Sequence, residues 1–148
     1  MPQSLSKVVV HIIFSTKNRV NFLEENIRLR MYAYIATVLR DMKSFVYCVD
    51  GTENHIHIAC TLPRTFSQSD FLNKIKNSSS KWIKNEGFND FYWQCGFGIF
   101  SISESHIDAL VKYIKSQMKH HKTKTFKEEF KEFFEKYNID YDEKYVWD

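Results

Sequence analysis

The sequence has few cysteines, and their arrangement argues against a disulfide framework or a zinc-thiolate site. Cys48, Cys60 and Cys95 make an odd number, contain no Cys-x-x-Cys pair and lie in apolar runs. Disulfide frameworks are marked by even counts and zinc-thiolate sites by closely spaced pairs. We therefore expect three small core residues in a protein that works in a reducing compartment.

The sequence also lacks long apolar runs and a strong excess of one charge. No segment is long enough to span a membrane and none resembles a signal peptide, so we expect a soluble intracellular protein with no membrane partner. The 21 Lys and Arg residues against 18 Asp and Glu give a net charge of +3. That excess is too small to imply a nucleic-acid partner by itself.

What the sequence does contain is enough apolar material for one folded domain. It has 148 residues, of which 43% are hydrophobic and 16% aromatic, a composition typical of a globular protein. No repeat, low-complexity segment or interdomain linker interrupts it. We expect a single domain over residues 1–148, with a core at about 7–121 and a C-terminal helix and tail at about 125–148.

The order of the predicted elements indicates an α+β fold. Strands are predicted at 7–16, 44–49, 53–62 and 90–103, and helices at 24–42, 69–85, from about 105 and from about 125. Pairs in capping-box spacing mark the last two helix starts, Ser105 with Asp108 and Thr125 with Glu128. The β-α-β-β-α-β order is that of a ferredoxin-like antiparallel sheet with helices on one face. A third helix, which bears a tyrosine, and a C-terminal helix and tail follow it.

Two histidines lie two residues apart in the third predicted strand. Because side chains alternate along a strand, His55 and His57 point to the same face. In a ferredoxin-like sheet this strand is central, so the pair would sit on a rigid platform. Such a pair suits metal binding, but His-x-His spacing alone is weak, and two ordinary polar residues are the more common explanation.

The third predicted helix carries a group of polar side chains near its end. Tyr113, Gln117 and His120 follow i, i+4, i+7 spacing and would share one helix edge, amid several lysines. A phenol in a cationic surface suits a polyanionic substrate. The alternative is a solvent-facing edge with a half-buried tyrosine, which is common in helices.

The chain resembles a known family over nearly its whole length. "HIH" at His55–His57 resembles the histidine-apolar-histidine motif of HUH endonucleases, and "YIKSQ" at Tyr113–Gln117 resembles the Tyr-x-x-x-Gln helix of the single-tyrosine transposases of bacterial insertion sequences, the IS200/IS605-like family. "VHIIFSTKNR", "GTENHIHIACTLP", "LNKIKNSSSKW" and "WQCGFGIFSIS" resemble other segments of that family, in its order. Either short motif is common by chance, but the ordered set is specific.

The resemblance implies a DNA transposase that cuts and rejoins single-stranded DNA to mobilise an insertion sequence. His55, His57 and Gln117 would hold Mg²⁺ or Mn²⁺, the family's working ions, although imidazole by itself favours other transition metals. Tyr113 would be the nucleophile and form a 5′-phosphotyrosine link, which keeps the phosphodiester energy for rejoining. His120 would accept a proton or face a phosphate.

The family resemblance also suggests partners for this chain. It implies single-stranded DNA with hairpin-containing element ends, a homodimer in which one subunit's histidines work with the other's tyrosine, and the cytoplasm of a bacterial or archaeal cell. The side chains expected to contact DNA are Lys17, Arg19, Lys74, Lys76, Lys81 and His120. For the lysines of the second helix, a solvated surface is an equally good explanation.

Three other functions remain open at this stage. A domesticated tyrosine transposase acting on repeated palindromes would use the same chemistry. A non-catalytic, single-stranded nucleic-acid-binding module of ferredoxin-like fold would need neither the tyrosine–glutamine pair nor a metal. A two-histidine phosphoesterase would need two His-x-Ser/Thr motifs, and the sequence contains one, His121-Lys122-Thr123.

Overall fold

The computed structural model describes residues 2–121 and 123–148, with only the backbone at residue 120. Its strands are β1 (Val9–Ser15), β2 (Val46–Gly51), β3 (His55–Thr61) and β4 (Gly98–Ile102). Its helices are α1 (Glu25–Asp41), α2 (Gln68–Asn85), α3 (Ile107–Lys115), α4 (Gln117–His120) and α5 (Phe126–Lys136), with 3₁₀ turns η1 (Lys17–Arg19) and η2 (Glu104–His106). None of the described helices is both long and apolar enough to cross a membrane.

The four strands form one antiparallel sheet in the order β2-β3-β1-β4. This order confirms the ferredoxin-like topology, with β1 and β3 as the central pair. In their register Ile13 lies opposite His57, and Ser15 lies opposite His55. Both histidines therefore lie in mid-sheet, in the part of β3 next to the end of β1.

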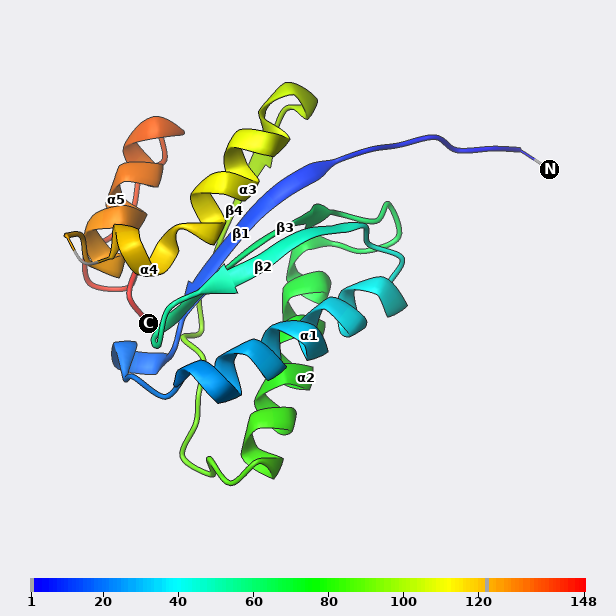
Figure 1. The fold of residues 1–148 in the computed structure, drawn as a ribbon. Helices are drawn as coiled ribbons and strands as arrows, with labels where there is room; N and C mark the ends of the chain where they lie inside the picture. The colour runs from blue at the N-terminus through cyan, green and yellow to red at the C-terminus, as the bar shows by residue number, and fades with distance from the viewer. Residues whose placement is uncertain (1, 122) are drawn as a thin grey trace.

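Alternation along β3 divides its side chains between the two faces of the sheet. Ile56, Ile58 and Cys60 pack into a core with α1 and α2. The opposite face carries His55 and His57 and is covered by α3, α4 and α5 (Figure 1). The sheet thus separates the first two helices from the elements that surround the histidines.

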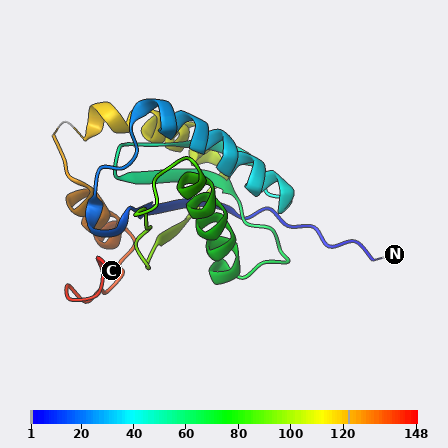
Figure 2. The same ribbon diagram turned by 90° about the horizontal axis from the view of Figure 1, so that it is seen from below.

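The C-terminal helix docks on β1 and β4 through aromatic side chains. Phe130 of α5 packs with Ile13 and Phe100, and a Cβ atom at Gly98 would lie 2.6 Å from its ring. Glycine at that position therefore lets α5 approach the sheet closely. Beyond α5 the chain returns to η1, and both views place the C-terminus beside that turn (Figures 1 and 2).

Three sequence-based expectations need correction. The fourth strand is short because residues 90–97 pair with the sheet only through one bridge, between Thr16 and Trp93. The third helix breaks at Ser116, so α3 and α4 are separate. Cys95 is exposed rather than part of the core, whereas Cys48 and Cys60 are buried.

The two expected helix caps also differ in outcome. Ser105 does not cap α3, which begins after His106 without a side-chain cap. Thr125 does cap α5, because its hydroxyl accepts a hydrogen bond from the amide of Glu128. That cap fixes the start of the helix that docks beside the histidines.

Candidate active site and metal centre

The two strand histidines are fully buried and point into a polar cluster. Nε2 of His55 lies 3.2 Å from Oε1 of Gln117, and Nε2 of His57 lies 3.0 Å from Oε1 of Glu129. Burial, together with the neighbouring imidazoles, lowers the pKa of His55 to about 3. His55 is therefore neutral at physiological pH, which is the form that can bind a metal.

A third buried histidine stands behind the pair. His11 of β1 is 1% exposed, and its Nε2 lies 2.7 Å from Nδ1 of His57. Burial and the adjacent His57 hold the pKa of His11 well below its ordinary value. A neutral His11 can donate to or accept from His57, so it orients the ring that presents Nε2 to the cluster.

The structure brings Tyr113 to the same cluster. Tyr113 is a half-buried residue in the last turn of α3, and its hydroxyl donates a short hydrogen bond to Oε2 of Glu129. Burial and the negative Glu129 raise the pKa of Tyr113. Gln117 follows the helix break and donates to the same Oε2 at 3.2 Å. The predicted nucleophile and the predicted amide ligand thus meet on one carboxylate.

That carboxylate, Glu129, is the main residue that the sequence interpretation missed. It is 0% exposed, although α5 is otherwise apolar on this face. Burial would raise the pKa of Glu129, but hydrogen bonds from His121 and His57 outweigh it and lower the pKa. The available signal was its spacing: Glu129 lies three residues after Phe126 and four before Phe133, within the apolar stripe of the helix.

His121, which no sequence motif singled out, also reaches the cluster. Its Nε2 lies 3.0 Å from Oε1 of Glu129. The potential ligand atoms of His55, His57, His121 and Glu129 all lie within 4.8 Å of one another. Neutral imidazoles and a carboxylate are the ligand types of a divalent transition-metal site, so the residues present fit a metal ion.

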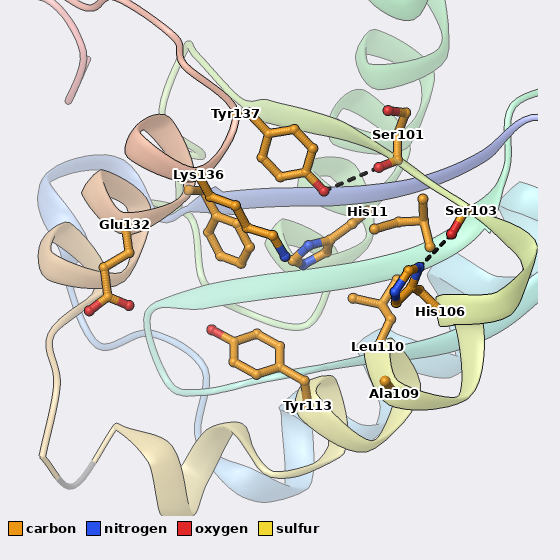
Figure 3. A pocket seen from close by; sticks show the side chains of 12 residues that line it. His11, Ser101, Ser103, His106, Ala109, Leu110, Tyr113, Glu132, Lys136 and Tyr137 are labelled. Carbon is orange, nitrogen blue, oxygen red and sulfur yellow. Dashed lines mark hydrogen bonds between the residues drawn. The ribbon is translucent and has the colours of Figure 1, made fainter.

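A cavity of about 670 Å³ opens beside Tyr113, between α3 and α5 (Figure 3). Its floor includes His11 and its wall includes the Tyr113 ring. At its rim the hydroxyl of Tyr137 donates to the carbonyl of Ser101, as Figure 3 shows. The Tyr113 ring therefore lies between the histidine cluster and this cavity, which is also lined by residues of β4.

One known protein family matches most of this chain. The family model "Transposase IS200 like" matches residues 4–117. The chain belongs to the IS200-like transposase family. The match includes His55, His57, Tyr113 and Gln117 and ends before His121 and Glu129. No curated protein matches the sequence.

Two solved structures share the fold of this IS200-like transposase. A crystal structure from Deinococcus radiodurans R1, described as a candidate transposase, has a TM-score of 0.62 at 15% identity and covers 79% of this chain and 98% of its own. A REP-associated tyrosine transposase bound to a REP hairpin has a TM-score of 0.61 at 21% identity, over 82% of this chain and 73% of its own.

The predicted DNA-contacting residues of this IS200-like transposase do not gather at the cluster. Lys74 and Lys81 are exposed on α2, across the sheet from Tyr113. Lys76 donates to the carbonyls of Gln94, Cys95 and Gly96 at 2.6–3.2 Å, so its ammonium is engaged within the fold.

The remaining candidates lie nearer the end of the sheet that carries the histidines. Lys17 is exposed in η1, and Arg19 donates to the carbonyl of Trp147 at 2.7 Å. The side chain of His120 lies outside the described residues. Of these three residues, Lys17 is the one with a described and exposed side chain.

Proposed function

We propose that this IS200-like transposase cleaves and rejoins single-stranded DNA with Tyr113 as its nucleophile. The observation that carries the proposal is the convergence of the Tyr113 hydroxyl, Gln117 and His57 on the single buried carboxylate of Glu129. A phenol held beside side chains that could bind a metal is placed to attack a phosphate that binds there.

In the proposed step the Tyr113 oxygen attacks the scissile phosphorus. A bond forms between that oxygen and phosphorus, the bond from phosphorus to the 3′ oxygen breaks, and the departing 3′ oxygen takes a proton from water to become a free 3′-hydroxyl. The phenolic proton passes to Oε2 of Glu129, its present hydrogen-bond acceptor. Reversal by another 3′-hydroxyl rejoins DNA without an external energy source, because the phosphotyrosine link keeps the phosphodiester energy.

The strand histidines and Gln117 would hold the divalent cation. When bound, a cation supplies positive charge that offsets Glu129 and the phosphate and favours the phenolate. The chain's own groups do the remaining work: His11 orients His57, and the sheet fixes His55. The proposal takes Mg²⁺ or Mn²⁺ as the ions of the family.

The proposed substrate is a hairpin-containing DNA end, and the proposed assembly a homodimer. A hairpin is supported by the similarity in fold to a REP-associated transposase bound to a REP hairpin. Within one chain, Tyr113 and His57 both contact Glu129, and the sharing of sites between subunits stays a prediction. A second copy is not needed to bring these residues together.

The test is formation of a covalent protein–DNA adduct with a labelled single-stranded hairpin substrate and Mn²⁺. The Tyr113→Phe variant should lose the adduct completely while its fold is kept, because the reacting oxygen is removed and the ring remains. Tyr92→Phe, at an exposed tyrosine away from the cluster, is the matched control and should react as the unmodified chain does. An adduct that maps to another tyrosine would refute the assignment, and a fully active Tyr113→Phe variant would do the same.

A further inference from the structure

The proposed cleavage leaves the cavity beside Tyr113 without a role. The cavity has a volume of about 670 Å³ and lies between α3, β4 and α5 (Figure 3). Sites that bind small organic groups usually have volumes of about 300–1,000 Å³ and are lined mostly by apolar and aromatic side chains, with a few polar groups that orient the ligand. The cavity is therefore large enough to hold a group of nucleoside size.

Three rings form one corner of this cavity. The ring of Tyr113 lies edge to face against His11 and Phe133, with centroid separations of 6.4 and 6.1 Å, and His11 meets Phe133 in the same way at 5.1 Å. Phe133 also stacks on Phe100 of β4 at 5.3 Å. The rings thus hold one another in fixed orientations. A flat aromatic group that enters the cavity can contact them by offset stacking or edge to face.

Polar side chains lie at the rim of the cavity. Glu132 and Lys136 are exposed on α5, and His106 is exposed in the turn before α3, where its ring is hydrogen-bonded to the hydroxyl of Ser103. A carboxylate, an ammonium and an imidazole together offer both acceptors and donors to the edge of a base. Lysine is also a residue type that contacts DNA phosphates. The lining therefore suits a ligand that is flat and aromatic with a polar edge.

The Tyr113 side chain connects this cavity to the site of cleavage. Its hydroxyl donates to Glu129 in the histidine cluster, whereas its ring forms part of the cavity wall. In the proposed reaction, on which this step rests, the phenolic oxygen becomes bonded to the 5′ phosphate of the nucleotide on the 3′ side of the cut. That nucleotide is therefore held beside the ring. In single-stranded DNA its base can stack on an aromatic side chain.

We propose that the cavity binds the nucleobase on the 3′ side of the cut, the one whose 5′ phosphate Tyr113 attacks. The base lies against the rings of Tyr113 and Phe133, and its polar edge faces the side chains at the rim. This contact positions the phosphate relative to the phenolic oxygen before attack, and it retains the covalently attached strand after the other strand has left.

The test is binding of the four deoxynucleoside 5′-monophosphates to the full chain, measured by ligand-observed NMR titration without DNA. At least one of them should bind about 5-fold or more tightly than deoxyribose 5-phosphate, because stacking of one base on an aromatic side chain strengthens binding by about 5- to 150-fold. The corresponding 3′-monophosphate should bind more weakly than the 5′-monophosphate, because its phosphate is on the other side of the sugar.

A cavity-filling variant shows whether the base binds at this place. Ala109 is exposed on α3 and lines the cavity, so Ala109→Trp puts an indole ring where the base would lie and should abolish the preference over deoxyribose 5-phosphate. Ala33→Trp, at an exposed alanine of α1 on the other face of the sheet, is the matched control and should bind as the unmodified chain does. If Ala109→Trp does not fold, Lys136→Trp fills the cavity from α5 and decides by the same criterion.

Three results would overturn the proposal. They are equal binding of every nucleotide and deoxyribose 5-phosphate, an unchanged preference in the folded cavity-filling variant, and tighter binding of the 3′-monophosphates, which would place the other base in the cavity. The outcome is separate from that of the adduct assay. Base-dependent binding with no adduct on DNA would refute the proposed function alone, and an adduct with no base-dependent binding would refute this proposal alone.

Discussion

Histidine residues in this chain have roles that differ with their hydrogen-bond partners. His57 presents Nε2 to Glu129 and Nδ1 to His11, so its ring is held from both sides. If a metal takes the lone pair of Nε2, the proton of His57 must be on Nδ1, where His11 can accept it. His11 is therefore a positioning residue, which would act on the cluster through its hydrogen bond with His57.

We expect replacement of His11 to weaken metal binding without removing a ligand. His11→Phe keeps the ring volume but loses the acceptor, and metal affinity should fall about 10–100-fold. His11→Gln keeps a side-chain acceptor and should recover part of that loss. Calorimetric titration with Mn²⁺ measures both variants. Equal affinity of His11→Phe and the unmodified chain would show that His11 fills space only.

At the scale of elements, the site is built where four segments meet at one face of the sheet. β3 supplies the histidine pair, α3 the tyrosine, the start of α4 the glutamine and α5 the glutamate. The break at Ser116 separates the tyrosine and glutamine helices, yet both side chains still meet at Glu129. The position of α5, fixed by its Thr125 cap and aromatic face, decides where Glu129 lies.

On the other face, α2 is tied to the loop that precedes β4. Lys76 donates to three carbonyls of residues 94–96, and burial lowers the pKa of Lys76 to about 8. The same loop meets the end of the chain, since the amide of Gly96 donates to the carbonyl of Asp148. Lys76 therefore stabilises the segment on which the C-terminus rests.

We expect Lys76→Met to destabilise the fold, because it leaves these carbonyls without their charged donor. The free energy of unfolding should fall by about 2 kcal/mol, a typical value for hydrogen bonds to a charged group. Lys74→Met, at an exposed lysine two residues earlier, should change it by less than about 0.5 kcal/mol. Urea unfolding measures both. A loss of DNA binding with full stability in Lys76→Met would instead support its predicted role as a DNA contact.

At the scale of the whole molecule, one chain contains every group that the proposed cleavage uses. The sheet places α1 and α2 on one face and α3, α4 and α5 on the other (Figure 1). The aromatic cluster around Phe130 holds the C-terminal helix on the histidine face. Within the single folded chain, Tyr113 and His57 both contact Glu129 of that chain.

We expect that mixing two defective chains restores no activity. A His57→Ala chain retains Tyr113, and a Tyr113→Phe chain retains the histidines, so an adduct would appear on the first chain only if sites were shared between subunits. Differently tagged chains, with subunit exchange checked by co-purification, make the measurement. Adduct formation on the His57→Ala chain would show sharing in trans, which the family resemblance suggested.

Local sequence patterns were enough to predict the topology and four candidate site residues. The order of the predicted elements indicated the ferredoxin-like sheet. Those elements were predictable because hydrophobic periodicity and turn residues depend on neighbouring positions in the chain. His55 and His57 were predictable from strand alternation, and Tyr113 and Gln117 from a motif within one short segment. Each of these signals depends on residues that are close together in the chain.

Long-range packing brings further side chains, distant in sequence, to the candidate site. Glu129, His121 and His11 come from three other segments, and no local pattern links them to the histidine pair. Docking of α5 through aromatic packing buries Glu129 among the imidazoles, and pairing of β1 with β3 sets His11 behind His57. Long-range packing fixes such contacts. A buried charged group is costly unless it has hydrogen-bond or charge partners, and here those partners come from distant parts of the sequence.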